Sequence, residues 1–177
     1  MKRKFIRLCF YFIKSIIGIL VYFDSRLYMK TYNWLLGQSG MVIKGTPRFI
    51  AKSAKFDDFT RITIGDRLVV SMNVHFLTHD YSFTTALISI NKKPATDIGI
   101  LRNIKIGDNV FIGMNTILLP GSTIGNHVII GAGSVIRGLI PDYSIIAGNP
   151  AKVIGDIRDL AHKVETRENQ DFHIDKT

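Results

Sequence analysis

Aliphatic residues recur every six positions over the C-terminal half of the chain, and this spacing limits the possible folds more than any other feature. In four of these hexads glycine follows the aliphatic residue directly, as in Ile106-Gly107 and Ile112-Gly113. Four positions after the aliphatic residue the chain often carries a small one, such as Thr116 or Ser122. The aliphatic positions are Ile106, Ile112, Leu118, Ile124, Ile130 and Ile136.

A period of six fits neither an α-helix, which needs spacings of 3 and 4, nor a lone strand, which alternates every 2. It fits a coil of three short strands, in which each aliphatic side chain stacks on its equivalent about 18 residues later. A sandwich of short strands would instead place turns about 8 to 12 residues apart. The same rhythm appears upstream, and we predict an all-β fold, a parallel β-helix. The upstream positions are Ile50, Phe56, Ile62, Leu68 and Val74.

The hexad rhythm breaks from Leu77 to Asn103 and returns at Ile104. A long loop that projects from a regular solenoid is usually functional, so we expect loop 77–103 to form part of an active site. His79 opens this loop in the run Thr78-His79. An imidazole titrates near neutral pH and can take a proton from a hydroxyl.

The hexads, together with the segment AGNPAKVI at residues 147–154, resemble the hexapeptide-repeat acyltransferase family over about residues 40–156. The order of parts is similar to that of maltose and galactoside O-acetyltransferases and of capsule and exopolysaccharide O-acetyltransferases. The resemblance implies a left-handed parallel β-helix with a protruding loop, and a homotrimer with active sites between subunits. It also implies transfer of an acetyl group from acetyl-CoA to a sugar hydroxyl, in bacterial surface polysaccharide biosynthesis.

The resemblance also suggests residue roles. His79 becomes the general base, and Asn73 lies near the acceptor and the oxyanion, although a corner asparagine of the solenoid is an equal interpretation. The backbone N–H of Met114 corresponds to an oxyanion donor, and Ala132 to a contact with the pantetheine arm. Preorganised donors of this kind stabilise the charge that develops during acyl transfer.

The phosphates of coenzyme A need basic groups, and Arg137, Lys152 and Arg158 are the candidates, with Asn149 and Pro150 as further cofactor-binding residues. Arg137-Gly138 departs from the family, in which Thr-Lys is common, so these contacts are shifted or weaker. Phe111, where relatives commonly carry Trp, can pack against an acyl-CoA arm.

The start of the loop supplies candidate substrate contacts. Asp80 and Tyr81 follow His79 directly and are candidate acceptor-binding residues. Asp80 can also orient the imidazole or begin a turn, and of these two roles the turn is favoured.

The net charge of +9 is concentrated at the N-terminus, where residues 1–44 hold eight basic side chains and one acid. On a helical projection Arg3, Lys4, Arg7 and Lys14 share one face, which is typical of a helix lying in a membrane interface. We expect residues 1–39 to form amphipathic helices that contact an anionic membrane surface, or that pack on the protein or a neighbouring subunit. The opposite, apolar face holds Phe5, Leu8, Cys9, Phe12, Ile13, Ile16, Ile19, Leu20 and Phe23.

Arg7 and Lys14 would be costly at a bilayer centre and argue against a span. A second helix is expected from Ser25 to Leu36, and residues 157–177 are expected to form a short capping helix and a frayed tail. The single cysteine, Cys9, excludes a disulfide framework and favours a reducing compartment. We therefore expect a cytoplasmic protein, peripheral on the inner face of the membrane.

Three other functions share this fold. A sugar-nucleotide N-acyltransferase would use an amine acceptor, and a hexapeptide scaffold would have no catalysis. A γ-class carbonic anhydrase needs three histidines around one zinc, and His75, His79 and His127 are poorly spaced for that. We therefore expect no metal. We also expect no nucleic-acid partner, because the basic residues cluster on an apolar segment.

Overall fold

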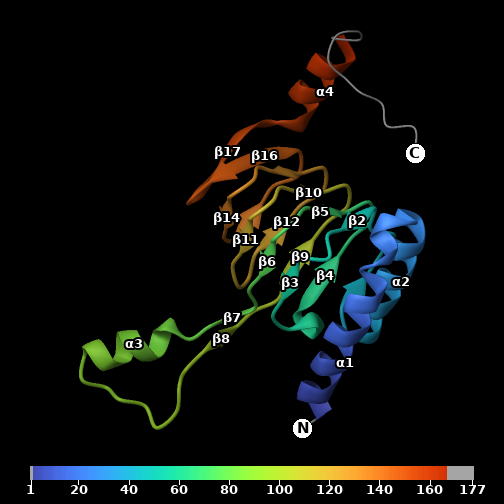
Figure 1. Cartoon of the computed structure of the whole chain (residues 1–177). Coiled ribbons are helices and arrows are strands. Elements are labelled where there is room, and N and C mark those ends of the chain that lie inside the picture. The colour runs from blue at the N-terminus through green and yellow to red at the C-terminus, as the bar shows by residue number, and fades with distance from the viewer. Residues whose placement is uncertain (1, 167–177) are drawn as a thin grey trace.

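The computed structural model describes residues 2–166, with side chains from Cys9 onward. Three sheets, parallel except for the pair β16–β17, form the sides of a triangular coil, which confirms the predicted β-helix (Figure 1). Sheet 1 contains β1 (Val42–Ile43), β4 (Ile62–Ile64), β9 (Ile104–Ile106), β12 (Thr123–Ile124) and β15 (Leu139–Ile140). Sheet 2 contains β2 (Phe49–Ile50), β5 (Val69–Val70), β10 (Phe111–Ile112), β13 (Ile129–Ile130), β16 (Ser144–Gly148) and β17 (Ala151–Asp156). Sheet 3 contains β3 (Lys55–Phe56), β6 (His75–Phe76), β11 (Ile117–Leu118) and β14 (Val135–Ile136).

The hexad positions form the core of the coil, as the sequence predicts. Ile112 pairs with Ile130 and Leu118 pairs with Ile136, so equivalent residues lie 18 positions apart in neighbouring coils. Each of the six aliphatic residues is buried, and so are the small residues four positions later. Stacking of identical positions therefore fixes the register from one coil to the next.

The corner between sheets 2 and 3, called the 2–3 corner below, uses left-handed backbone. Asn73, Asn115 and Gly133 occupy it in successive coils with φ values of 56°, 59° and 70°. Asparagine and glycine adopt this conformation at the lowest cost. One coil face also requires glycine for space, because a Cβ on Gly113 would lie 2.5 Å from the backbone N of Ala132.

Two helices close the open end of the first coil, α1 (Lys2–Ile17) and α2 (Ser25–Gln38), joined by the 3-10 turn η1 (Leu20–Tyr22) (Figure 1). The Tyr28 hydroxyl donates to the Ile50 carbonyl at 2.8 Å, and the Ile50 N–H donates to the Met29 sulfur at 3.2 Å. These bonds satisfy backbone groups of the end strand that would otherwise remain open to pairing with another chain. The second helix is thus confirmed and extends two residues beyond its predicted end.

The predicted apolar face of α1 is wrong in part. Phe10, which is not on that face, is 2% exposed and packs with its ring centroid 4.5 Å from that of Phe59. Phe12 is 69% exposed, although it belongs to the predicted face. Lys14, expected on the polar face, turns toward the coil and donates to the Ala54 carbonyl at 2.9 Å. The helix therefore packs through the stripe that contains Phe10, Lys14 and Ile17.

Burial lowers the pKa of the Lys14 ammonium to about 8, because a low-dielectric environment disfavours the charged form. The ammonium also lies 5.7 Å from the ring centroid of Phe10 and 5.6 Å from that of Tyr32. No helix among residues 2–166 is long and apolar enough to cross a bilayer.

The segment that breaks the hexad rhythm forms a projecting arm. Its base is an antiparallel pair, β7 (His79–Asp80) with β8 (Ile100–Leu101), and its tip carries α3 (Ser82–Ser89) (Figure 1). Ile112 and Val70 are paired although 42 positions separate them, which is 24 more than a regular coil uses. The sequence predicts only a loop here, because nothing in it repeats.

Two elements complete the chain. The 3-10 turn η2 (Phe59–Arg61) leads into β4, and α4 (Ile157–Thr166) follows the antiparallel pair β16–β17. The expected short C-terminal helix is therefore confirmed. The expected frayed tail falls on residues 167–177, outside the described residues.

Candidate active site

His79 lies where the projecting arm leaves sheet 3, and a carboxylate from the coil below holds its ring. The Nδ1 atom of His79 is 3.1 Å from Oδ2 of Asp57. The same oxygen accepts the backbone N–H of Thr78 at 3.2 Å. The His79 side chain is 42% exposed.

Asp57 was not singled out in the sequence, although the coil register points to it. Phe56 pairs with Phe76, so Asp57 lies beneath the residues that follow β6, where the arm begins. The pairing of neighbouring coils could therefore have predicted this acidic residue below the candidate base, whereas the sequence around His79 could not. A carboxylate at this distance orients the imidazole and favours a proton on Nδ1.

Asp80 begins a turn, as the favoured interpretation predicts. Its Oδ1 accepts the backbone N–H of Ser82 at 2.8 Å. That hydrogen bond is the main reason that the pKa of the Asp80 carboxyl lies below its ordinary value, and nearby Arg137 and His79 add to the effect. Tyr81 is half-exposed, and its ring lies edge-on to His79 with 5.3 Å between the centroids.

A small cavity of about 300 Å³ opens at the base of the arm, next to these residues. Asp80 and two arginines, Arg102 and Arg137, contribute charged groups to its wall. The backbone N–H of Arg102 donates to the Thr78 carbonyl at 2.9 Å, which ties β8 to the start of β7. Arg137, expected at the phosphate end of a coenzyme A site, thus lies beside Asp80. Arg102 was not predicted.

A second group of predicted residues follows the 2–3 corner. Met114 and Ala132 stand there in successive coils, and the Met114 carbonyl accepts the N–H of Gly133 at 2.8 Å. Among the described residues, no hydrogen bond engages the Met114 N–H. Asn73 takes the left-handed corner conformation one coil earlier, which supports its interpretation as a corner residue.

The C-terminal turn of the coil lies above the same corner. The Gly148 N–H donates to Oγ of Ser134 at 3.2 Å, which ties the turn carrying Asn149 and Pro150 to the last full coil. Lys152 is exposed on β17.

Two more candidate residues for binding of coenzyme A are Phe111 and Arg158. Phe111 is half-exposed on the outer face of β10. Arg158, a further candidate for phosphate, is neutralised by Asp156, with Nη2 and Oδ2 2.6 Å apart.

The two groups lie at opposite ends of the strands of sheet 3. Asn73, Met114 and Ala132 precede these strands, whereas His79 and Arg137 follow them. One protomer therefore does not bring the candidate base and the candidate oxyanion donor to one place.

The histidines required for a γ-class carbonic anhydrase do not converge. His127 is stacked on Tyr143, with centroids 5.1 Å apart, and its Nδ1 lies 3.0 Å from Nδ2 of Asn109 at another corner. In the part of the chain that the structure describes, no three His, Cys, Asp or Glu side chains are grouped as metal ligands.

Known proteins share this architecture. The family described as "Bacterial transferase hexapeptide (six repeats)" matches residues 103–138. A galactoside acetyltransferase in complex with coenzyme A superposes with a TM-score of 0.62 at 20% identity, covering 93% of this chain and 88% of that one. This likeness shows a common fold.

Two curated relatives are similar in sequence. Protein CapG of Staphylococcus aureus is 44% identical over 111 residues, which are 63% of this chain and 60% of that protein. The putative lipopolysaccharide biosynthesis O-acetyl transferase WbbJ of Escherichia coli (strain K12) is 34% identical over 117 residues, which are 60% of this chain and 59% of that protein. The chain thus spans about three fifths of the length of either relative.

Proposed function

We propose that the chain transfers an acetyl group from acetyl-CoA to a saccharide hydroxyl, and its similarity to hexapeptide-repeat acetyltransferases supports this proposal. The observation that carries the proposal is the 3.1 Å contact between His79 Nδ1 and Asp57 Oδ2. A sugar hydroxyl is a poor nucleophile until a base takes its proton, and an oriented, exposed imidazole suits this task.

Each residue has a role in the proposed reaction. Asp57 accepts a hydrogen bond from the Nδ1–H group of His79, which leaves the lone pair of Nε2 free. Nε2 then takes the hydroxyl proton as the hydroxyl oxygen attacks the thioester carbon. The backbone N–H of Met114 donates to the oxygen that becomes negative. When the C–S bond breaks, the proton on Nε2 passes to the departing sulfur, giving the ester, free coenzyme A and a regenerated base.

The site is completed between protomers of a homotrimer in this proposal. The base and the oxyanion donor lie at opposite ends of sheet 3 in one protomer. A neighbouring copy that presents its 2–3 corner to the arm would bring the two together, along with Phe111 and the turn that carries Asn149, Pro150 and Lys152.

Similarity to proteins named for saccharide chemistry supports a sugar acceptor. WbbJ is named for lipopolysaccharide biosynthesis, and the galactoside O-acetyltransferase of Escherichia coli (strain K12) is 36% identical over 109 residues. Asp80 and Tyr81, beside His79, are the proposed acceptor contacts. The cavity at the base of the arm adds Arg102 and Arg137, so an acceptor with an acidic group is favoured.

The test measures thiol release from acetyl-CoA with galactosides, maltose and bacterial oligosaccharides as acceptors. His79→Ala should lower turnover at least 100-fold, whereas His162→Ala, an exposed histidine on α4, should leave it unchanged. NMR of the product separates an ester from the amide of an N-acyltransferase. Unchanged turnover in His79→Ala, or an amide product, would overturn the proposal.

A further inference from the structure

The packing of α1 leaves a row of large apolar side chains uncovered. Phe12 and Ile16 are four residues apart and lie on one face of α1. Ile19 and Phe23 follow at the two ends of the turn η1. All four are more than half exposed, and Phe23 reaches 81%. Contiguous apolar surface of this kind marks an interaction site on a folded protein.

Aromatic residues with a polar atom accompany this row. Tyr22 is 74% exposed, and Nζ of Lys52 lies 4.5 Å from its ring centroid and 2.8 Å from its hydroxyl. Trp34, the only tryptophan in the chain, is 59% exposed on α2. Tyrosine and tryptophan favour the boundary between water and hydrocarbon, where the ring is apolar and its edge is wet.

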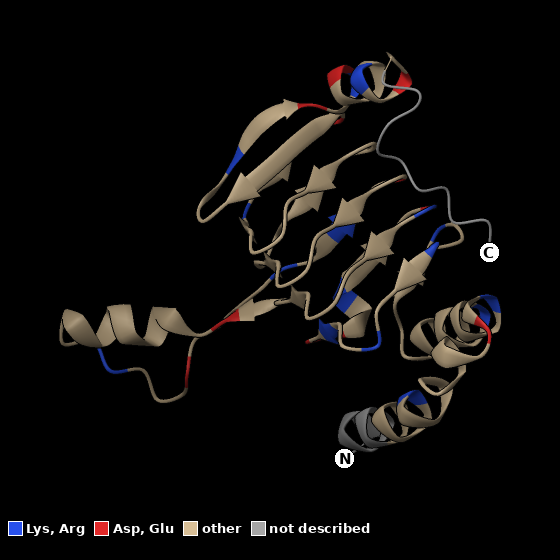
Figure 2. Ribbon diagram, turned by 45° about the horizontal axis from the view of Figure 1, so that its top comes forward, with Lys and Arg blue, Asp and Glu red and all other residues tan. Residues whose placement is uncertain are grey.

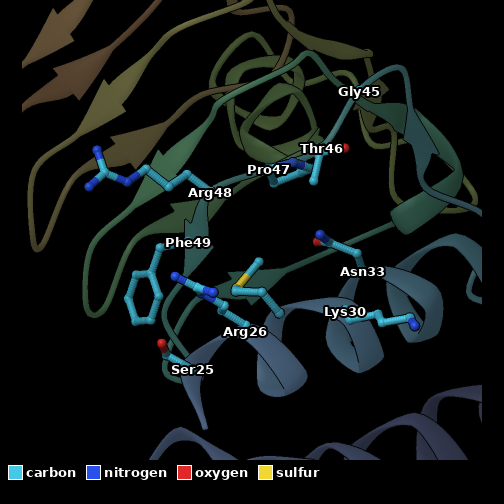
Figure 3. Close-up of a pocket in the computed structure, with 10 residues that line it drawn as sticks. Ser25, Arg26, Lys30, Asn33, Gly45, Thr46, Pro47, Arg48 and Phe49 are labelled. Carbon is cyan, nitrogen blue, oxygen red and sulfur yellow. The ribbon is translucent and has the colours of Figure 1, made fainter. Parts of the chain in front are cut away.

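A basic cavity begins where the row ends. It holds about 720 Å³ between α2 and the first coil, and its wall starts at Ser25, two residues after Phe23. Arg26, Lys30 and Arg48 line it, together with uncharged residues and no carboxylate (Figure 3).

Among residues 9–166, whose side chains the structure describes, no ion pair engages Arg26, Lys30 or Arg48. Figure 2 shows basic residues on the N-terminal helices and the adjoining coil. In Figure 3 the side chains of Arg48 and Lys30 extend away from each other, so the oxygens of more than one phosphate would supply the acceptors that these cations need.

We propose that the N-terminal end of the molecule docks on an anionic phospholipid bilayer. The row formed by Phe12, Ile16, Ile19 and Phe23 enters the interface, and the cations that line the basic cavity bind headgroup phosphates. Charge complementarity selects this occupant, because residues 1–44 carry eight basic side chains and one acid. A second copy of the chain on the same surface would bring like charges together, which is unfavourable.

The experiment uses the full chain with phosphatidylcholine vesicles and with vesicles that also contain phosphatidylglycerol. Co-sedimentation and Trp34 fluorescence report binding, and circular dichroism confirms that each variant is folded. We expect binding and a blue shift only with phosphatidylglycerol, and weaker binding as salt rises. The double variant Phe12→Ser with Ile16→Ser should lower the fraction bound at least tenfold, because it removes apolar area.

A matched pair of charge variants separates the cavity from net charge. The triple variant Arg26→Gln, Lys30→Gln, Arg48→Gln should bind at least tenfold more weakly. The control triple Lys92→Gln, Lys93→Gln, Lys105→Gln removes the same charge at exposed sites on the arm and on β9 and should bind as the wild type does.

Three results would overturn the proposal. The first is that the wild type does not bind vesicles, or binds both vesicle types equally. The second is an equal loss of vesicle binding in the two triple variants. The third is that the wild type does not bind vesicles while the Phe12→Ser, Ile16→Ser variant changes its oligomer mass, which would assign the row to a subunit contact. Acetyl transfer to a soluble acceptor is measured separately, so either result can fail alone.

Discussion

The coils and the segments attached to them obey different rules. In the coils each buried residue stacks on its equivalent in the next coil, as Ile112 does on Ile130. A shift in the pairing of one strand would therefore misplace the buried residues on all three sides of the coil. In α1 the orientation depends on a few individual contacts, those of Phe10, Lys14 and Ile17. A repeat therefore allows the fold to be predicted from the sequence. A helix with two apolar stripes can pack on the protein through either stripe, so its orientation cannot be predicted in the same way.

The sharpest contrast comes from two glycines. A Cβ on Gly113 would meet the backbone of Ala132 at 2.5 Å, whereas a Cβ on Gly37, in α2, would meet nothing within 4 Å. Gly113→Val should therefore cost more than about 4 kcal/mol of unfolding free energy. Gly37→Ala should add about 0.5 kcal/mol or more, because alanine favours a helix. Chemical denaturation measures both, and similar effects at the two sites would refute the contrast.

The orientation of α1 is tested by two neighbouring phenylalanines. Phe10→Ala should cost about 3 kcal/mol, because it removes a buried ring, and Phe12→Ala should change stability by less than about 0.5 kcal/mol. Hydrogen exchange should show α1 opening first in Phe10→Ala while the coils stay protected. A larger loss of stability in Phe12→Ala than in Phe10→Ala would show that α1 packs through the apolar face predicted from the sequence.

Lys14 gives α1 a dependence of stability on alkaline pH. Its pKa falls from 10.5 to about 8 on folding, so between pH 8 and pH 10.5 the unfolded state holds a proton that the folded state has released. Stability should then rise with pH across this window, by about 2 kcal/mol at most after allowance for solvent. Below pH 8 this contribution stays constant, because both states carry the proton.

Denaturation at pH 7.5 and pH 9.5 tests this slope. These values lie below the range in which buried Tyr28 and Tyr32, whose pKa values are raised, would lower stability as the unfolded state loses its phenolic protons. Lys14→Met should remove the slope and Lys105→Met, at an exposed site, should keep it. A slope unaffected by Lys14→Met would show that another group causes it.

The same contrast explains what the sequence could predict. Hexads such as Ile106-Gly107 identify the coils, and the interruption after Phe76 locates the arm and His79. The partner of His79 was missed, because Asp57 lies 22 positions earlier and meets it only through stacking of coils. The helix and the strand pair of the arm were missed because they follow no repeat. The position of Arg137 beside Asp80 could not be predicted, because it depends on a tertiary contact with the arm, and its role at the phosphates of coenzyme A stays a prediction.

The central claim is that Asp57 positions the imidazole of His79 for proton transfer, and the kcat of two carboxylate variants tests it most directly. Asp57→Asn removes the charge held 3.1 Å from Nδ1, whereas Asp80→Asn changes a carboxylate that bonds Ser82 instead. Asp57→Asn should lower kcat for acetyl transfer about 100-fold with little change in KM, and Asp80→Asn should lower it less than about threefold. An equal loss in both variants, or full activity in Asp57→Asn, would contradict the account.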